Sequence, residues 1–371
     1  MSRISTTTVT AKAPSSSSTT WRRLRFIPLV AGALAMAVGL WTGLARLGLS
    51  LPGGMPALAE FHAALMIAGF LGTLISLERA VALGRCWGYA APALSALAAV
   101  ALFAGAPGPA GVGFLLASGV LFAASVQLAL RHFALFSLVL AVAPACWVAG
   151  TALWLTGSSL PEVSGLWLDF LVLTVAAERL ELGRIRQPSL MAQAVFAAAA
   201  LLVVIGGVGG PASATAARVM GSGLVACAAW LLRYDIAART IRQSGQRRFS
   251  ACCILAGHVW LGIAGIILLL VPPGATAFSY DAAVHAIAIG FVLSMIFGHA
   301  PIILPAVVRI RVGYRAAAYV WLALLHVSVV LRVGGDLLEF TDLRAASGIL
   351  TVLALAGYAM TLATAPRAAP A

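Results

Sequence analysis

The sequence predicts an all-α fold: a polytopic integral membrane helix bundle of about twelve transmembrane helices, with both termini cytoplasmic. Hydrophobic residues make up 62% of the 371 residues and charged residues only 9%, whereas soluble domains carry about 25% charged residues. The mean hydropathy is +1.02, and apolar stretches of about 20 residues, each long enough to cross a bilayer, recur along the chain. Because such a chain could not cover a water-facing surface, a soluble protein is excluded and the lipid bilayer is its first partner.

The predicted spans follow one another without a visible soluble domain. A Ser/Thr-rich N-terminus is predicted to be disordered and cytoplasmic, and the longest hydrophilic connection divides an eight-span bundle from a histidine-bearing four-span bundle. The corresponding ranges are 1–25, 26–235 (spans one to eight), 236–250 (a basic cytoplasmic loop) and 251–366 (spans nine to twelve). By hydropathy the spans centre near Gly39, Gly69, Leu97, Gly119, Ala145, Leu173, Ala199, Val225, Gly262, Leu293, Leu325 and Leu355.

The charges support the same topology independently. Basic clusters precede span one and follow each even-numbered span, so they share one side, which the positive-inside rule makes cytoplasmic. The opposite loops carry acidic residues. The basic residues include Arg22, Arg23, Arg25, Arg79, Arg85, Arg131, Arg179, Arg184, Arg186, Arg233, Arg239, Arg309, Arg311 and Arg315, and the acidic ones are Glu60, Glu162, Asp281, Asp336, Glu339 and Asp342.

The formal net charge of +13 is therefore a topology signal and does not indicate a nucleic-acid surface. The arginines are dispersed over short loops, without the aromatic-interleaved patch that nucleic-acid binding would need. The five cysteines show no C-x-x-C spacing. No triad, phosphate-loop or dinucleotide motif supports a hydrolase, kinase or dehydrogenase, so whether the protein turns over a substrate stays open.

Two short sequence similarities between spans, which we call echoes, suggest an internal repeat. The alternative is a chance similarity between segments that are built from the same few apolar residue types. Glu78-Arg79 ends span two as Glu178-Arg179 ends span six, with Phe70 and Phe170 in the same register, and each Glu-Arg pair is expected at the cytoplasmic boundary. The second echo relates span two to span ten: His62-Ala63 with Gly69-Phe70, against His285-Ala286 with Gly290-Phe291.

Histidines in the apolar stretches are the main functional signal. His285 and His299 lie 14 positions apart in span ten, which is about four helical turns or about 21 Å on one face. Ionisable groups at membrane depth are rare and usually functional, and histidine is the commonest metal ligand.

Topology assigns the histidines to two depths. His62 and His285 enter spans two and ten near the outer face, and His258 can lie level with His299 near the cytoplasmic third. His326, in the middle of span eleven, is as compatible with helix packing as with ligation. The distribution suggests two metal centres, or one centre and a polar relay.

Haem b is the first candidate cofactor and copper the second, because neutral imidazole is a good ligand for both metals. Arg332, one of few arginines on the outer side, could pair with haem propionates. Pro301 and Pro305 directly follow His299 and would distort the helix there. The small residues that could let a macrocycle approach are Gly69, Gly72, Gly257, Gly290 and Gly298.

At these residues the chain resembles the NnrS family. The resemblance rests on Phe61-His62-Ala-Ala-Leu-Met-Ile-Ala-Gly-Phe70, on His285-Ala286 with Gly290, on Gly298-His299, and on Leu331-Arg332-Val333. It departs at Ala64 and Leu65, where the family often has a second histidine and a glutamate, and at Ala300-Pro301 after His299.

The resemblance implies a twelve-span protein of the bacterial cytoplasmic membrane, associated with haem and copper and with nitric-oxide metabolism, denitrification or nitrosative stress. Its partner would be a small diatomic ligand or a redox partner. Two haems, at His62 with His285 and at His258 with His299, are one arrangement. One haem with copper at His258, His299 and His326 is another. The rival interpretations are a secondary transporter or metal-handling permease that uses the intramembrane histidines, and an assembly factor that binds metal transiently.

Overall fold

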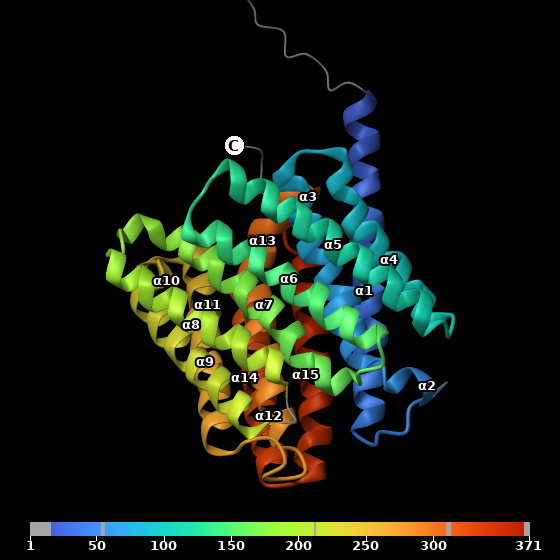
Figure 1. The fold of residues 1–371 in the computed structure, drawn as a ribbon. Coiled ribbons are helices and arrows are strands. Elements are labelled where there is room, and N and C mark those ends of the chain that lie inside the picture. Colours follow the sequence, from blue (N-terminus) through green and yellow to red (C-terminus); the bar gives the residue numbers. More distant parts are fainter. Residues whose placement is uncertain (1–15, 53–55, 211–212, 309–312, 367–371) are drawn as a thin grey trace, which may run out of the picture.

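The structure, a computed structural model, describes residues 16–52, 56–210, 213–308 and 313–366, and regular structure in these ranges is entirely helical (Figure 1). The predicted all-α class is therefore confirmed. In chain order the elements are α1 (Ser16–Arg46), α2 (Pro56–Ala59), η1 (Ala64–Gly72), α3 (Thr73–Leu83), η2 (Cys86–Tyr89), α4 (Ala90–Phe103), α5 (Pro107–Arg131), α6 (Leu135–Leu155), α7 (Leu160–Gly183), η3 (Arg184–Arg186), α8 (Leu190–Gly209), α9 (Ala214–Tyr234), α10 (Ala237–Thr240), α11 (Gly245–Leu270), α12 (Ser279–His285), η4 (Ala286–Leu293), α13 (Ser294–Val308), α14 (Ala318–Leu337) and α15 (Thr341–Ala363).

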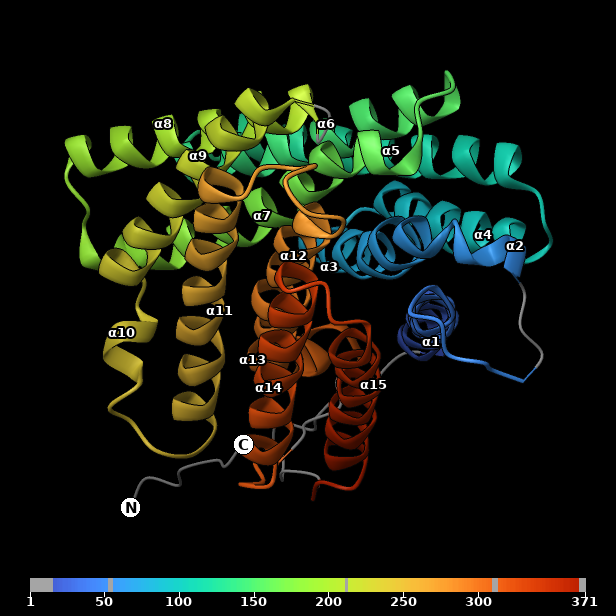
Figure 2. The same cartoon turned by 90° about the horizontal axis from the view of Figure 1, so that it is seen from below.

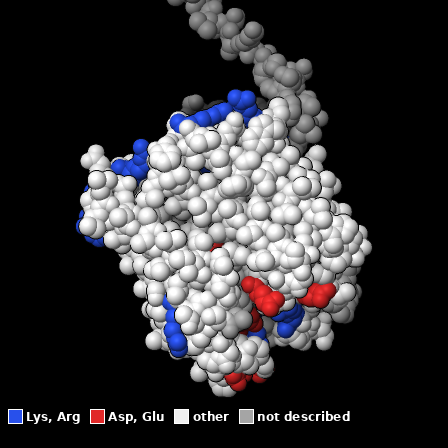
Figure 3. Space-filling model, in the orientation of Figure 1, with Lys and Arg blue, Asp and Glu red and all other residues white. Residues whose placement is uncertain are grey.

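Twelve helical stretches within the described residues are long and apolar enough to cross a membrane, and each contains one predicted span centre. The chain is therefore a multi-pass membrane protein that contacts the bilayer. α1 begins and α15 ends at the same end of the bundle (Figure 1). Arginine gathers at that end and acidic side chains at the opposite one (Figure 3), so we call the two ends cytoplasmic and outer. Residues 1–15, Arg309 and Arg311 lie outside the described residues.

The helices pack in chain order into a closed bundle around α7. Each span contacts the next, and α15 returns to contact α1, while α4 and α5 lie on the side away from α11 and α14 (Figure 2). The most apolar stretch of α7 is 78% buried, more than that of any other span, and span two follows at 67%. A span so enclosed by protein can carry polar side chains that lipid would not tolerate.

Spans two, six and ten, each four spans after the last, meet in the centre. α7 contacts both η1 and η4, and α3 contacts α13. These are the three spans that the two sequence echoes relate, so the echoes coincide with a shared position in the bundle. Their common register is Phe70, Phe170 and Phe291, each followed eight residues later by Glu78, Glu178 and His299.

Spans two and ten also share an unusual local conformation. The π-helical segment η1 starts two residues after His62, and the π-helical segment η4 starts directly after His285. π-helical turns carry one extra residue per turn, are rare, and occur frequently at functional sites. The structure therefore gives the two His-Ala motifs the same helical context.

The two predicted bundles pack tightly against each other through α9 and α11. Gly221 and Gly265 face each other there, and a Cβ on Gly221 would lie 2.7 Å from the Gly265 carbonyl oxygen. Small residues at such contacts let membrane helices approach closely. The predicted loop 236–250 contains α10 and the start of α11.

Candidate functional site

The outer histidines hold their rings in the same way. Nδ1 of His62 lies 2.7 Å from the Gly39 carbonyl oxygen, and Nδ1 of His285 lies 2.8 Å from the Asp281 carbonyl oxygen. Because a carbonyl can only accept, Nδ1 must carry the hydrogen in each ring. A neutral ring then leaves the lone pair on Nε2, which is the arrangement of metal-bound histidines.

The two outer imidazoles come from different helices and lie near each other. They are close enough that a positive charge on His62 would act on His285. Burial lowers the pKa of His62, which precedes span two, to about 4, although its hydrogen bond to Gly39 opposes the shift. The ring is therefore neutral near pH 7. Both residues keep some accessible surface, and the hydrogen bonds of the two rings in the described structure are made by Nδ1 and leave Nε2 without a partner.

Gly43 in α1 makes room for the ring of His62. A Cβ built on Gly43 would lie 2.7 Å from Cε1 and 3.0 Å from Nδ1 of His62. Most glycines predicted to admit a macrocycle are used differently: a Cβ on Gly72 would meet Trp147 at 2.6 Å, and one on Gly290 would meet Trp260 at 2.5 Å. Those two glycines let tryptophans pack against the central spans, and Gly43 is the small residue beside a candidate ligand.

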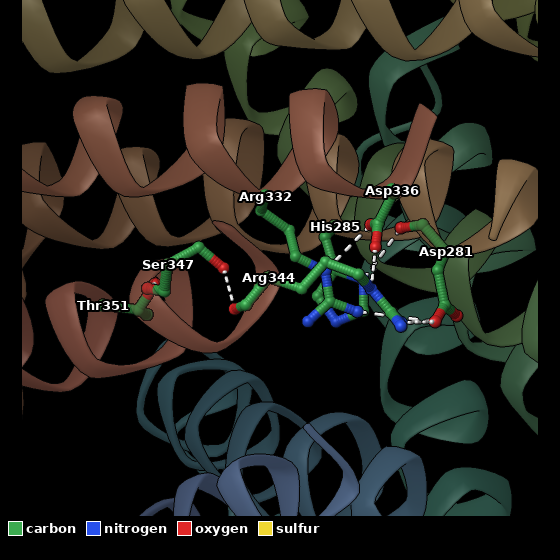
Figure 4. Close-up of polar contacts among 7 residues, drawn as sticks. All are labelled: Asp281, His285, Arg332, Asp336, Arg344, Ser347 and Thr351. Carbon is green, nitrogen blue, oxygen red and sulfur yellow. Dashed lines mark hydrogen bonds and ion pairs between the residues drawn. The ribbon is translucent and has the colours of Figure 1, made fainter. Parts of the chain in front are cut away.

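A charged network closes the outer end around His285 (Figure 4). Asp336, fully buried in α14, accepts from Arg332 Nε at 2.8 Å and from Arg344 Nε of α15. The second nitrogens of the two arginines reach Asp281 at 3.4 Å and 3.0 Å. Two guanidiniums thus lie between two carboxylates beside His285, and Arg332 lies where the sequence predicted it, near both outer histidines.

Two further arginines at the outer end were not predicted as site residues. Arg344 also stacks on Phe278, with its guanidinium carbon 3.3 Å from the ring centroid. Arg46, exposed at the end of α1, acts electrostatically on His62 and on Asp281. Three arginines and two aspartates leave a net positive charge beside the histidines. The signal for both arginines was in the sequence, since each departs from the positive-inside pattern.

The inner histidines lie in a second polar cluster, the inner cluster, made of Arg179, Asp235, His258 and His299. Arg179 Nη2 lies 3.2 Å from His299 Nε2. Asp235 Oδ2 lies 3.9 Å from Arg179 Nε and 3.6 Å from His258 Nε2. Because a guanidinium can only donate, Nε2 of His299 accepts and its lone pair is engaged.

Three of the four side chains of the inner cluster are almost completely buried. Asp235 and His258 have no exposed side-chain surface, and Arg179 retains 4%. Burial raises the pKa of the Asp235 carboxyl, while Arg179, Arg186 and the Ala237 amide oppose the shift. His258 and His299 thus lie at the same depth, as predicted, and Arg179 and Asp235 connect them. Neither Arg179 nor Asp235 was predicted as a site residue. We do not assign these two histidines as metal ligands.

His326 belongs to neither cluster. Its Nδ1 accepts a hydrogen bond of 3.0 Å from the Trp260 indole. Of the two roles considered for His326, this contact favours helix packing over metal ligation. Among the residues that the structure describes, no three His, Cys, Asp or Glu side chains form a metal-ligand group. A copper centre at His258, His299 and His326 therefore has no support in the geometry.

The cytoplasmic Glu-Arg motifs pair with each other across helices. Arg79 Nη2 lies 3.2 Å from Glu178 Oε1, with 15% and 24% of the two side chains exposed, and the carboxylate of Glu78 is close enough to act on Glu178. Arg179 instead turns inward to the inner cluster. Glu78 and Arg79 lie at the cytoplasmic boundary as predicted. In the second motif Glu178 lies at that boundary, whereas the Arg179 side chain is buried in the interior.

Asp169 in α7 is a further buried carboxylate that was not predicted as a site residue. It is fully buried, neither of its oxygens has a hydrogen-bond partner in the described structure, and its Oδ2 points at Gly207 of α8. Its charge also acts on Tyr280, whose hydroxyl lies 2.7 Å from Ser164 Oγ. The sequence signal was a carboxylate in the middle of an apolar span.

The fold and the two clusters define a polytopic all-α membrane protein with buried ionisable side chains at two depths. The chain belongs to the family described as Domain of unknown function (DUF8744), whose model matches residues 23–367. No curated protein matches the chain.

Proposed function

We propose that this protein binds haem b at its outer end, where His62 and His285 would hold the iron. One observation carries the proposal: two imidazoles, that of His62 just before span two and that of His285 in span ten, lie near each other, and each donates Nδ1–H to a carbonyl and leaves Nε2 without a partner. Bound haem would supply one-electron chemistry or binding of a diatomic ligand.

The surrounding residues fit such a group. Gly43 leaves space for the His62 ring, because a Cβ at this position would displace the ring. Arg332, Arg344 and Arg46 supply guanidinium donors beside the histidines, and their positive charge exceeds that of the two aspartates. Propionate carboxylates are the anionic groups that such arginines would pair with.

The wider role we propose is in nitric-oxide or nitrosative-stress metabolism, or in membrane electron transfer, in the bacterial cytoplasmic membrane. This part rests on the resemblance of the His62, His285 and Arg332 motifs to the NnrS family. Copper remains a further candidate metal from the same resemblance. Turnover of a substrate is not part of the proposal.

The experiment is the reduced-minus-oxidised absorption spectrum of the detergent-purified protein after haem-replete expression, with haem and copper quantified. A b-type spectrum is expected, lost or strongly altered in His62→Ala and His285→Ala. His326→Ala is the matched control, since it removes a partly buried intramembrane histidine whose Nδ1 is engaged by Trp260. A colourless wild-type protein, or a spectrum that survives His285→Ala, would refute the proposal.

A secondary transporter or permease is the second candidate, and Asp169 favours it. A buried carboxylate without a partner in mid-span is a common proton or cation site in transporters. Pro301 and Pro305 lie inside α13, where each removes one backbone hydrogen-bond donor. If the protein is colourless, Asp169→Asn becomes the decisive variant. Loss of proton-coupled uptake into vesicles with Asp169→Asn, but not with the outer-face control Asp342→Asn, would establish this alternative.

A further inference from the structure

We propose that the inner cluster of Arg179, Asp235, His258 and His299 is a hydrated site that holds an exchangeable proton and communicates with the cytoplasmic end. Its ligand class is water with one proton. The inference is independent of haem binding, because it uses none of the residues of the outer pair.

The inner cluster contains buried polar atoms that lack a hydrogen-bond partner. Asp235 Oδ2, both ring nitrogens of His258 and Arg179 Nε are buried and have no hydrogen-bond partner in the described structure. Buried polar groups in folded proteins are nearly always hydrogen-bonded, and each one left unsatisfied costs about 1–3 kcal/mol. Three of these atoms, Asp235 Oδ2, His258 Nε2 and Arg179 Nε, lie close together, and they therefore indicate a small polar ligand beside them.

The distances suit water. Asp235 Oδ2 lies 3.6 Å from His258 Nε2 and 3.9 Å from Arg179 Nε, which is too long for direct hydrogen bonds but short enough for a shared bridging molecule. A buried water typically makes about three hydrogen bonds, and this cluster offers a carboxylate, a guanidinium and an imidazole. A metal is not required to satisfy them.

In and next to the cluster, His299 and Glu178 are side chains that keep part of their surface accessible. His299 keeps part of its surface accessible while its Nε2 accepts from Arg179. Glu178, which precedes Arg179 in the chain, is 24% exposed and lies near Glu78. His299 also takes the register position that glutamate occupies in spans two and six, so the three central spans place a protonatable side chain at this level.

The charged groups that face the carboxylate come from every neighbouring element. Arg179 approaches from α7, Arg186 of η3 acts on Asp235 and donates to its backbone carbonyl, and His258 approaches from α11. The other carboxylate oxygen accepts from the Ala237 amide at 2.8 Å. One oxygen is thus fixed by the backbone, and Oδ2 is the position at which a proton can be held.

The proton step balances without any further reactant. A hydronium ion at the cytoplasmic surface gives its proton through the bridging water to Asp235. An O–H bond forms on Oδ2, one O–H bond of hydronium breaks, and a water molecule remains. In the reverse step the Oδ2–H bond breaks and the proton returns to water, which becomes hydronium. The proton can also pass onward to the lone pair of His258, where an N–H bond forms as the Oδ2–H bond breaks.

Infrared difference spectroscopy between acidic and alkaline buffer, on the full-length purified protein, tests the site. We expect a protonated-carboxyl C=O band that shifts promptly in D₂O and is lost in Asp235→Asn. Asp169→Asn is the matched control, because it removes another fully buried carboxyl and should leave this band in place. A band that persists in Asp235→Asn, or one that does not respond to D₂O, would overturn the proposal.

A second variant covers the case in which Asp235→Asn does not fold. His258→Gln retains the carboxyl and removes the neighbouring base, so the band should remain while its pH midpoint moves. An unchanged midpoint would contradict a shared proton. The visible spectrum of the same samples reports haem separately, so failure of the haem proposal and failure of this one are read from different signals.

Discussion

The guanidinium of Arg179 lies 3.2 Å from Nε2 of His299. Four spans earlier, the guanidinium of Arg79 lies at the same distance from Glu178. In register, Arg79 and Arg179 are equivalent, and so are Glu178 and His299. Each arginine therefore contacts the equivalent position of the next central span.

Double-mutant cycles should give a larger coupling energy for the buried contact than for the exposed one. For Arg79 and Glu178, which are partly exposed, we expect a coupling energy of about 0.2–1 kcal/mol. For Arg179 and His299 the coupling should be larger, up to about 3 kcal/mol, because the guanidinium is shielded from water. Unfolding in detergent with alanine variants measures both cycles. Equal couplings, or a larger one for the exposed pair, would contradict this ranking.

Gly43→Ala should disturb the outer histidine, since the new methyl group would lie 2.7 Å from the His62 ring. The ring must move, so we expect a weakened or shifted haem spectrum with the fold retained. Gly119→Ala is the control: it is also a glycine within a helix, and a Cβ there meets nothing within 4 Å. It should be neutral or stabilising by up to about 1 kcal/mol. Identical spectra for the two variants would argue against a haem ligand at His62.

Asp336→Asn should destabilise the outer end strongly. The fully buried carboxylate accepts from both Arg332 and Arg344, and removing one member of a buried ionic group typically costs about 3–5 kcal/mol. Asp342→Asn, an exposed aspartate of the same helical hairpin, should change stability by less than about 0.5 kcal/mol. Thermal unfolding in detergent measures both. A small effect of Asp336→Asn would show that the two arginines do not depend on this carboxylate.

The stability of the wild-type protein should depend on pH through Asp235. Its pKa is raised by burial in the folded state, whereas an unfolded aspartate titrates near about 3.9. Between those two values the folded state binds more protons, so stability falls as pH rises through that window. Asp235→Asn should lose this dependence and gain stability relative to wild type as pH increases. Parallel pH profiles for the two proteins would rule the linkage out.

Much of the architecture could be predicted from local pattern. Span number and class follow from runs of apolar residues, because each helix satisfies its own backbone in lipid. Orientation follows from arginine in short loops. The pairing of His62 with His285 followed from their depth, since topology alone places both near the outer face.

The central position of α7 and the partners of the inner histidines were not predictable in this way. In the sequence, Arg179 and Asp235 are charged residues near the ends of spans six and eight. Nothing in their spacing shows that they converge on His258 and His299. Asp169 and Arg344 were equally visible in the sequence, but their burial depends on which helices surround them. Hydropathy measures how a segment meets lipid and carries no information about which neighbours replace that lipid.

The sequence by itself determined that this chain crosses a membrane twelve times, which end is basic, and how deep each histidine lies, because these depend on one segment at a time. Only the tertiary structure decided which nitrogen lone pairs are available and which are engaged. His62 and His285 keep Nε2 available, whereas that of His299 accepts from Arg179. The physical reason is that hydrogen bonding is set by atoms brought from distant helices, whose packing order no local pattern encodes.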